Sequence, residues 1–460
     1  MSGLPKGWIE LTLTDVVKDI TGGGTPSKSQ KEYFKGTIPF MTVKDMKVNR
    51  PDDTIDKITQ SAIDNSSANL IDANTLIIST RMGLGKIVKV DFACAINQDL
   101  KALYLEDVIN IDYFEYQYRS LTSLLESLGK GTTVKGIRLE VLKSIKILVA
   151  PLNEQIRIAN KLYSILAKVD KAQARLDKIP AILKRFRQSV LAAATSGELT
   201  KEWREELGIE WFTRCLTVEQ IAKKEKYSLG IGPFGSNLKV ADYRSEGHPL
   251  VFVREIRARQ FGGADTKFVD HGKFTELAAH RAKPGNILIT KMGDPPGDVA
   301  IYPDDCAEAV ITSDCIKLDV NEKLISKKFV FYYMQSEHFQ SQMRAITAGV
   351  AQQKVNLKNF KGLTLLAPSM EEQIEINRKI SRLMDRADTV EKQYREAKDR
   401  LDRLTQSILA KAFRGELVMQ DPNDEPAEKL LERILAEKEQ SEPKKTTLKR
   451  TTNAKTAEKE

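Results

Sequence analysis

Cysteine and histidine are scarce in this sequence. Its 460 residues include four cysteines, Cys94, Cys215, Cys306 and Cys315, which lie far apart and form no CxxC pair. This spacing argues against a disulfide framework and against a zinc site, so we expect reduced thiols and no metal. All four histidines lie in the second half of the chain. A histidine-based catalytic site therefore cannot be common to both halves.

Long apolar runs are also absent. No stretch reaches the roughly 18 apolar residues that a membrane-spanning helix needs, and the start, MSGLPKGWIEL, lacks the apolar core of a signal peptide. We therefore expect no membrane partner and a cytoplasmic location.

Loops that bind nucleotides or cofactors are incomplete. Residues 230–235 satisfy GxGxxG, but the pattern contains Pro233 and lacks the strand and helix of a dinucleotide-binding unit. The sequence DPPG at 294–297 resembles the DPPY motif of adenine methyltransferases, but Gly297 cannot stack on a flipped base. No GK pair is followed by the Ser or Thr that a phosphate-binding loop requires. We expect no cofactor and no catalytic site in this chain.

Positive charge is present in excess. The chain has 72 Lys and Arg against 63 Asp and Glu, a net charge of +9, in a composition that is otherwise ordinary for a soluble protein of two or three domains. A basic balance favours a polyanionic partner, and nucleic acid is the first candidate.

A long helical pattern occurs twice. Apolar residues at 154–199 recur at alternating spacings of four and three, and the pattern returns at 372–417 in the same register. This helix seam includes Leu162, Ile165, Val169, Leu176 and Leu183 in the first copy and Ile380, Leu383, Tyr394, Leu401 and Leu404 in the second. One such helix alone would be ordinary core. Two in register predict an antiparallel coiled coil, in which each helix buries the stripe of the other. Pro180 predicts a kink, because an interior proline removes a helix hydrogen bond.

The segments that precede the two helices repeat as well. Strand-like apolar runs at 38–43 and 74–80 match runs at 248–257 and 286–293, and another lies at 144–150. The sequence therefore predicts an α+β protein, with two duplicated α/β domains separated by two long paired helices. The expected boundaries are 1–150 for the first domain, 151–200 for the central helix, 201–367 for the second domain with its linker, 368–420 for the distal helix, and 421–460 for a short helix and a disordered polar tail.

Basic and amide residues recur in the loops of both domains. A solvated surface explains any single lysine, whereas repetition at matched places favours a surface that contacts phosphates or base edges. Three pairs match in kind: Lys44 with Arg254, Lys47 with Arg257, and Arg81 with Lys291. The full set of DNA-binding candidates is Lys28, Lys44, Lys47, Arg81, Lys86, Ser236, Asn237, Lys239, Arg254, Arg257, Lys291, Gln352 and Gln353.

Four segments together resemble one protein family. They are GGGTPSKSQKEYFKGTIPFMTVKDM and GPFGSNLKVADYRSEGHPLVFVREI in the domains, and APLNEQIRI and LTQSILAKAFRGEL at the helix ends. These segments resemble the specificity subunit of type I restriction-modification enzymes, and the closing helix is most similar to the K-12 branch of that family. The resemblance spans residues 4–437.

The resemblance implies a non-catalytic subunit with two target-recognition domains. Each domain would read one half of a bipartite site in double-stranded DNA, and the helices would set the gap and dock two modification (methyltransferase) subunits. S-adenosylmethionine, ATP and Mg²⁺ would bind the modification subunits and the restriction subunits, which act as translocase and nuclease.

Two other classes of protein remain as alternatives. A self-sufficient DNA methyltransferase would need the intact DPPY-type motif and cofactor loop that this sequence lacks. A coiled-coil scaffold without a role in DNA binding would not require matched basic loops.

Overall fold

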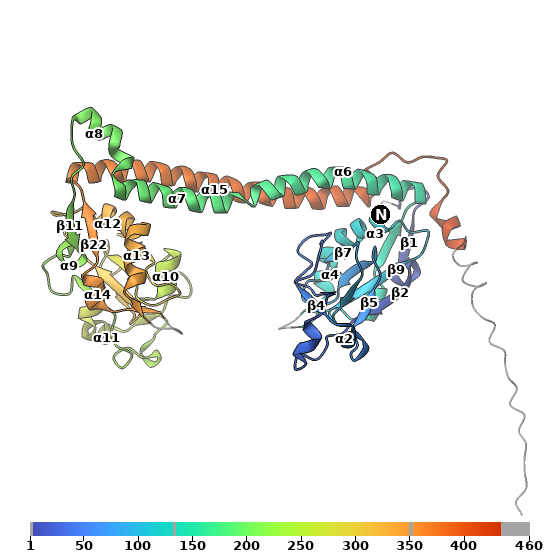
Figure 1. The fold of residues 1–460 in the computed structure, drawn as a ribbon, viewed down its shortest axis with the longest axis horizontal. Coiled ribbons are helices and arrows are strands. Elements are labelled where there is room, and N and C mark those ends of the chain that lie inside the picture. Colours follow the sequence, from blue (N-terminus) through green and yellow to red (C-terminus); the bar gives the residue numbers. More distant parts are fainter. Residues whose placement is uncertain (1–2, 132–134, 349–352, 434–460) are drawn as a thin grey trace, which may run out of the picture. The chain divides into compact units, whose positions relative to one another are not determined.

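The computed structural model describes residues 3–131, 135–348 and 353–433. The chain divides into two compact units, one formed by Met1–Arg175 with Ala397–Glu460 and the other by Leu176–Glu396. Each unit combines one globular domain with a stretch of paired helices (Figure 1). A short helix is described over 427–433, and the tail that we expect to be disordered lies outside the described residues.

The first domain contains two four-stranded sheets and a separate pair of strands. One sheet has the order β2-β9-β6-β7 and the other β4-β3-β8-β5, in which β3 and β8 run parallel. The strands are β1 Ile9–Thr12, β2 Val17–Gly22, β3 Ile38–Met41, β4 Asp56–Ile58, β5 Asn69–Ile71, β6 Leu76–Ser79, β7 Ile87–Lys89, β8 Cys94–Ile96, β9 Leu100–Leu105 and β10 Lys146–Val149. The helices are α1 Leu13–Val16, α2 Gln60–Asp64, α3 Ile111–Ser120, α4 Thr122–Leu128 and α5 Leu139–Lys143. Strands β1 and β10 pair with each other and join the two ends of the domain.

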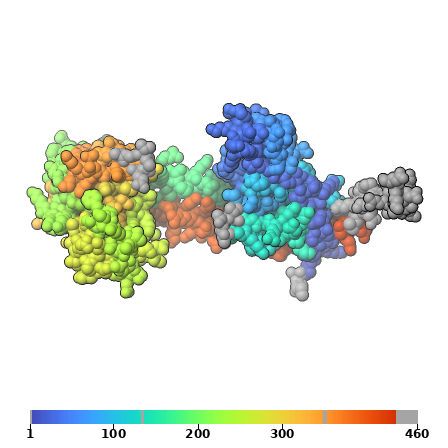
Figure 2. Space-filling model, turned by 90° about the horizontal axis from the view of Figure 1, so that it is seen from below, coloured from blue at the N-terminus to red at the C-terminus, as the bar shows by residue number. Residues whose placement is uncertain are grey.

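The second domain repeats this plan. Its sheets have the orders β12-β19-β16-β17 and β14-β13-β18-β15, again with one parallel pair, β13 and β18, and β11 pairs with β22. The strands are β11 Arg214–Thr217, β12 Leu229–Ile231, β13 His248–Val251, β14 Phe268–Val269, β15 Arg281–Ala282, β16 Ile287–Thr290, β17 Val299–Ile301, β18 Ala309–Ile311, β19 Cys315–Leu318, β20 Thr347–Ala348, β21 Lys354–Val355 and β22 Thr364–Ala367. The helices are α9 Val218–Ile221, α10 Val253–Ala258, α11 His271–Glu276, α12 Lys327–Met334, α13 Glu337–Ala345 and α14 Leu357–Lys361. In Figure 2 the orange part of this domain, which includes α12–α14, lies to one side of the yellow-green part.

Buried strands explain the apolar runs in the sequence. The runs at 38–43, 74–80 and 144–150 contain β3, β6 and β10, so these strand predictions are confirmed. Every residue of β6 and of β16 is buried, which accounts for a continuous apolar run instead of an alternating one. The duplicated α/β domains predicted from the sequence are therefore present.

The long helices are α6 (Leu152–Leu176), α7 (Ile179–Ser196) and α15 (Met370–Ala412). In the first unit, Ile158 near the start of α6 shares a core with Ala412 at the end of α15. In the second unit, Val190 near the end of α7 shares a core with Ile376 near the start of α15. The pairing is antiparallel in both units, as predicted. Of the seam residues, Leu162, Leu183 and Ile380 are buried, whereas Leu404 is 48% exposed.

The first long helix is divided near Pro180. Helix α6 ends at Leu176, and α7 begins at Ile179 with the proline in its first turn. A proline is tolerated there, because the first N–H groups of a helix have no partner within it. The predicted kink therefore takes the form of a break in the helix. Gly197, with a φ of 82°, caps the end of α7 in the left-handed conformation that favours glycine.

A buried glutamine fastens each domain to the helix that follows it. Gln155 accepts a hydrogen bond from the backbone N–H of Asn110 (2.8 Å) and donates to the carbonyl of Ala150 (2.8 Å). Gln373 repeats both bonds with the N–H of Ser326 (2.8 Å) and the carbonyl of Pro368 (2.9 Å). Both glutamines are 0% exposed. Each side chain therefore joins the N-cap of a domain helix, α3 or α12, to the start of a long helix.

A buried glutamate precedes each of these glutamines and holds the end of the partner helix. Glu372 accepts hydrogen bonds from Thr200 (2.6 Å) and Arg204 (2.6 Å), which follow α7. Glu154 accepts from the Trp8 indole (3.1 Å) and from Gln420, which follows α15 (3.4 Å). Burial raises the pKa of Glu154. In both units, polar contacts therefore join the start of one long helix to the residues that follow the other.

The substitution Gln373→Leu should destabilise the second unit. It keeps the side-chain volume but removes the hydrogen-bond partners of the partly buried N–H of Ser326 and of the buried carbonyl of Pro368, at up to about 1–3 kcal/mol for each group. Urea unfolding of the full chain measures the loss. Gln393→Leu, at an exposed position on the same helix, is the matched control and should change stability by less than about 0.5 kcal/mol. Equal stabilities of the two variants would show that the buried amide contributes nothing.

Candidate nucleic-acid interface

Three loops of the first domain meet beside the end of β6. The turn after β3 is held by Asp45, whose carboxylate accepts from the N–H of Thr42 (2.8 Å). A side chain at Gly83 would contact Val43 at 3.2 Å, so the loop 81–86 lies against this turn. The N–H of Met82 donates to the carbonyl of Lys135 (3.2 Å), which adds Lys130, Lys135 and Gly136 to the cluster.

The second domain assembles the same three loops. Glu255 accepts from the N–H of Phe252 (2.9 Å), as Asp45 does from Thr42. The N–H of Gly293 donates to the carbonyl of Gln353 (3.2 Å), and a side chain at Gly293 would contact Arg257 at 2.9 Å. The loops at 252–259 and 291–298 and the residues 353–355 are therefore neighbours.

A fourth loop joins each cluster through a short turn. In the first domain, the carbonyl of Ile96 accepts from Gly24 (3.1 Å), and that of Asp99 accepts from Thr80 (2.9 Å). In the second domain, the backbone carbonyl of Cys315 accepts from the N–H of Gly232 (3.2 Å), and that of Asp314 accepts from the backbone N–H of Lys291 (2.7 Å). The predicted loops at 22–28 and 232–239 thus lie beside the other candidate loops.

Two of the matched basic pairs occupy equivalent positions. Asp45 and Glu255 cap equivalent turns in the two domains. Lys44 is therefore structurally equivalent to Arg254, and Lys47 to Arg257. Lys44 and Lys47 are exposed. Arg254 donates to Glu255 (2.8 Å) and Arg257 to Asp298 (2.9 Å), so the second domain fixes its cations by ion pairs.

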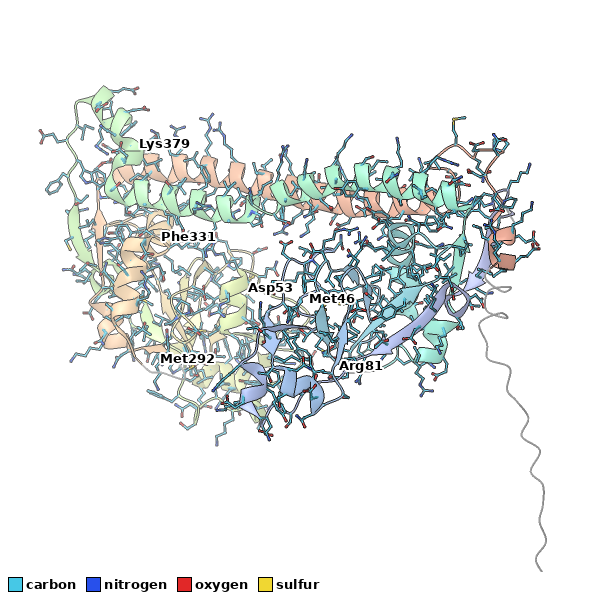
Figure 3. All side chains as sticks on the ribbon, turned by 45° about the vertical axis from the view of Figure 1, so that its right-hand side comes forward. Met46, Asp53, Arg81, Met292, Phe331 and Lys379 are labelled. Carbon is cyan, nitrogen blue, oxygen red and sulfur yellow. The ribbon has the colours of Figure 1, made fainter. Side chains whose placement is uncertain are left out.

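The third pair is offset by one residue. The N–H of Ile137 donates to the carbonyl of Thr80, and the N–H of Val355 donates to the carbonyl of Lys291. Lys291 is therefore the structural equivalent of Thr80. Arg81 is then the structural equivalent of Met292 (both are labelled in Figure 3). The cause is an extra residue before the glycine in the first domain, where Met82 adopts a φ of 59°. Arg81 lies 3.7 Å from Asp99, and Lys291 donates to the carbonyl of Ser313 (3.4 Å).

The other candidates lie on the surface of the same loops. Lys28, Lys86, Ser236, Asn237 and Lys239 are exposed. Gln353 is partly buried, and Gln352 lies outside the described residues.

Two exposed lysines of the first domain were missed from the sequence. Lys135 accepts the N–H of Met82 through its carbonyl, and Lys130 pairs with Gly136, which also pairs with Arg81. The parallel between GKGTTVKG and the TAGVAQQK segment could have pointed to them, since glutamines of the second segment were already candidates.

Two of the cysteines are buried, and one histidine packs against an aromatic ring. Burial raises the pKa of Cys94 and of Cys315 to about 12, so these thiols stay protonated and unreactive. His248 stacks on Phe274 with ring centroids 3.6 Å apart. Within the described residues, no group of three or more His, Cys, Asp and Glu side chains is placed to hold a metal ion. No helix in this part of the chain is long and apolar enough to cross a membrane.

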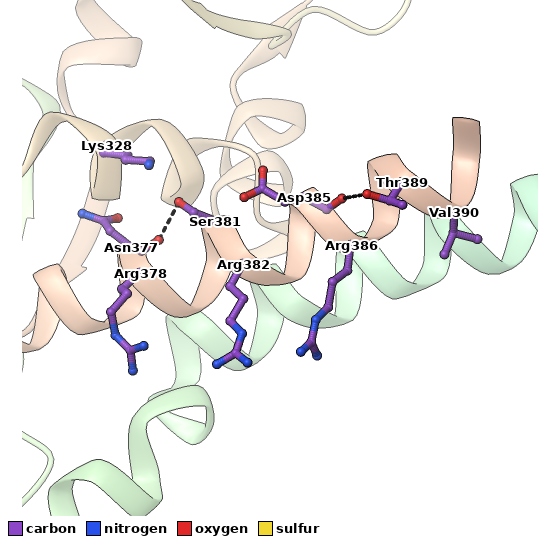
Figure 4. A pocket seen from close by; sticks show the side chains of 9 residues that line it. All are labelled: Lys328, Asn377, Arg378, Ser381, Arg382, Asp385, Arg386, Thr389 and Val390. Atoms are coloured by element: carbon purple, nitrogen blue, oxygen red, sulfur yellow. Dashed lines mark hydrogen bonds between the residues drawn. The ribbon is translucent and has the colours of Figure 1, made fainter. Parts of the chain in front are cut away.

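An open groove of 870 Å³ runs along the first half of α15 in the second unit (Figure 4). Arg378, Arg382 and Arg386 project from one side of the helix there, and Lys328 of α12 faces the groove. Arg378 is paired with Glu375 (2.7 Å). The corresponding residues of α6 are Asn160, Ser164 and Lys168, so the arginine row is particular to this copy.

Comparison with known proteins identifies relatives along the whole chain. The family model described as "Type I restriction modification DNA specificity domain" matches residues 5–181 and 267–398. The EcoKI specificity subunit of Escherichia coli (strain K12) is 28% identical, over 97% of this chain and 99% of its own length. The StySPI specificity subunit of Salmonella potsdam is 29% identical, with the same coverage.

A solved structure shares the fold. Its description is "Structural basis underlying complex assembly and conformational transition of the type I R-M system", and its chain is 16% identical with a TM-score of 0.63. The likeness covers 90% of this chain and 100% of the other. With a family model that matches more than half of its residues, the chain belongs to the family of type I restriction-modification DNA specificity subunits.

Proposed function

We propose that each domain reads one half of a bipartite site in double-stranded DNA, and that the paired helices set the gap between the halves. The carrying observation is that one cluster of basic loops is built twice, each time on a domain that a buried glutamine fastens to a long helix. The reading domains comprise 1–150 and 201–367, and the helices comprise 151–200 and 368–420.

The loop chemistry supports a division between positioning and reading. Lysine and arginine contact phosphates of any sequence, which fixes the domain on the duplex. Amide and hydroxyl groups, such as those of Ser236 and Asn237, have the donors and acceptors needed to distinguish base edges. The ion pairs of Arg254 and Arg257 restrict their rotamers, so these two suit directed contacts better than Lys44 and Lys47 do.

The helices offer surfaces for two modification subunits. The groove along α15 exposes Val390 (42%) beside the arginine row, a mixture of apolar and charged groups that suits a protein partner. In this proposal S-adenosylmethionine binds the modification subunits, and ATP and Mg²⁺ bind the restriction subunits. The complex works in the cytoplasm, where its DNA lies.

The proposed function is tested by expressing the chain with and without its partner subunits. The complex should methylate adenines in one bipartite motif, whereas the chain alone should transfer no methyl groups and hydrolyse no ATP. Sequencing of modified adenines and radiolabelled methyl transfer give the result. Methyl transfer or ATP hydrolysis by the isolated chain above that of a mock preparation would contradict the proposal. So would a methylated motif that stays the same when one domain is replaced by that of a relative.

The substitution Lys47→Ala tests phosphate contact in the first domain. If Lys47 neutralises one phosphate, the affinity of the complex should fall to a similar extent on all duplexes, and the slope of log K against log salt should become shallower by about 0.9. Fluorescence anisotropy at several salt concentrations measures both.

The matched control is Lys201→Ala, an exposed lysine on α8 (Lys201–Leu207), outside the candidate loops. Its affinity and slope should equal those of the unaltered complex. A Lys47→Ala complex with the same slope as this control would remove Lys47 from the interface.

A further inference from the structure

One of the candidate loops carries a solvent-exposed aromatic side chain. Phe234 is 71% exposed, between the buried Pro233 and the polar residues Ser236 and Asn237. An exposed ring of this size is unfavourable in water, and aromatic rings are common anchors of binding surfaces.

The backbone around Phe234 presents the ring from a fixed base. A side chain at Gly232 would lie 2.0 Å from the carbonyl of Thr312, so the loop rests directly on that turn. The N–H of Asn237 donates to the carbonyl of Phe234 (2.8 Å), which closes a tight turn just after the ring. The backbone that carries the ring therefore needs little reordering when the ring binds.

The surroundings of the ring are those of a nucleic-acid contact. The turn on which the loop rests also accepts the hydrogen bonds of Lys291, through Ser313 and Asp314. Phe234 thus belongs to the same cluster as the basic and amide candidates. An apolar ring among cations and amides is the combination with which proteins wedge base steps while holding the backbone.

We propose that Phe234 inserts its ring at a base step of the half-site read by the second domain. This inference rests on the proposed function and adds a contact to it that is independent of charge. The matching loop of the first domain, GGGTPSK, has no aromatic residue. The wedge is therefore confined to one half-site.

The test uses the assembled complex and a duplex carrying the motif that the complex methylates. Phe234→Ala should lower affinity for this duplex about tenfold, and Phe234→Trp should restore it, because the stacking of a base on an aromatic ring tolerates a change of ring. The salt dependence should stay unchanged, since no phosphate contact is lost. The fluorescence of 2-aminopurine, which replaces in turn each adenine within or beside the second half-site except the methylated one, should report unstacking at one step with the wild type and at none with Phe234→Ala.

Phe212→Ala is the matched control, since Phe212 is 73% exposed but lies in the segment before β11. It should bind like the wild type, and thermal unfolding should be the same for all variants. Wild-type affinity of Phe234→Ala, or unstacking that persists without the ring, would overturn the inference. Failure of the wild-type complex to prefer its own motif over a scrambled duplex would instead refute the proposed function.

Discussion

The structure depends on two buried glutamines, Gln155 and Gln373. Each buried amide accepts from a partly buried backbone N–H and donates to a buried backbone carbonyl, which makes the junction between domain and helix specific. The neighbouring Glu154 and Glu372 then hold the end of the partner helix. Because the glutamine contacts occur in both units, each domain has one defined attachment to the helices.

Under the proposed function, this attachment would let one fold read two different sequences. The junction and the loop positions are repeated, whereas the loop side chains differ, as Lys44 and Arg254 do. Under the proposed function, changes in the loops would alter which groups face DNA and would leave the attachment intact. The presence of Phe234 in one domain and of GGGTPSK in the other is such a difference.

Periodicity and repetition carried most of the fold prediction. The seam at spacings of four and three predicted the antiparallel helices, because burial of one stripe requires a partner. The break at Pro180 followed from the local tolerance of proline in a first helical turn, which spacing alone does not reveal. The shift of Arg81 against Lys291 depends on one left-handed residue, Met82, and the exposure of Phe234 depends on how its loop rests on Thr312. Such details come from tertiary contacts between segments far apart in the sequence.

The most direct test of the account lengthens the paired helices. Four residues are inserted at Arg175/Leu176 together with four at Glu396/Ala397, the boundaries between the two units, which adds about 6 Å to each helix. Insertion of four residues after Gly208, in the linker, is the control. Sequencing of methylated adenines should show a gap longer by one or two base pairs, at about 3.4 Å each, with both half-sites unchanged. The original gap, or an altered half-site, would contradict the claim that these helices set the distance.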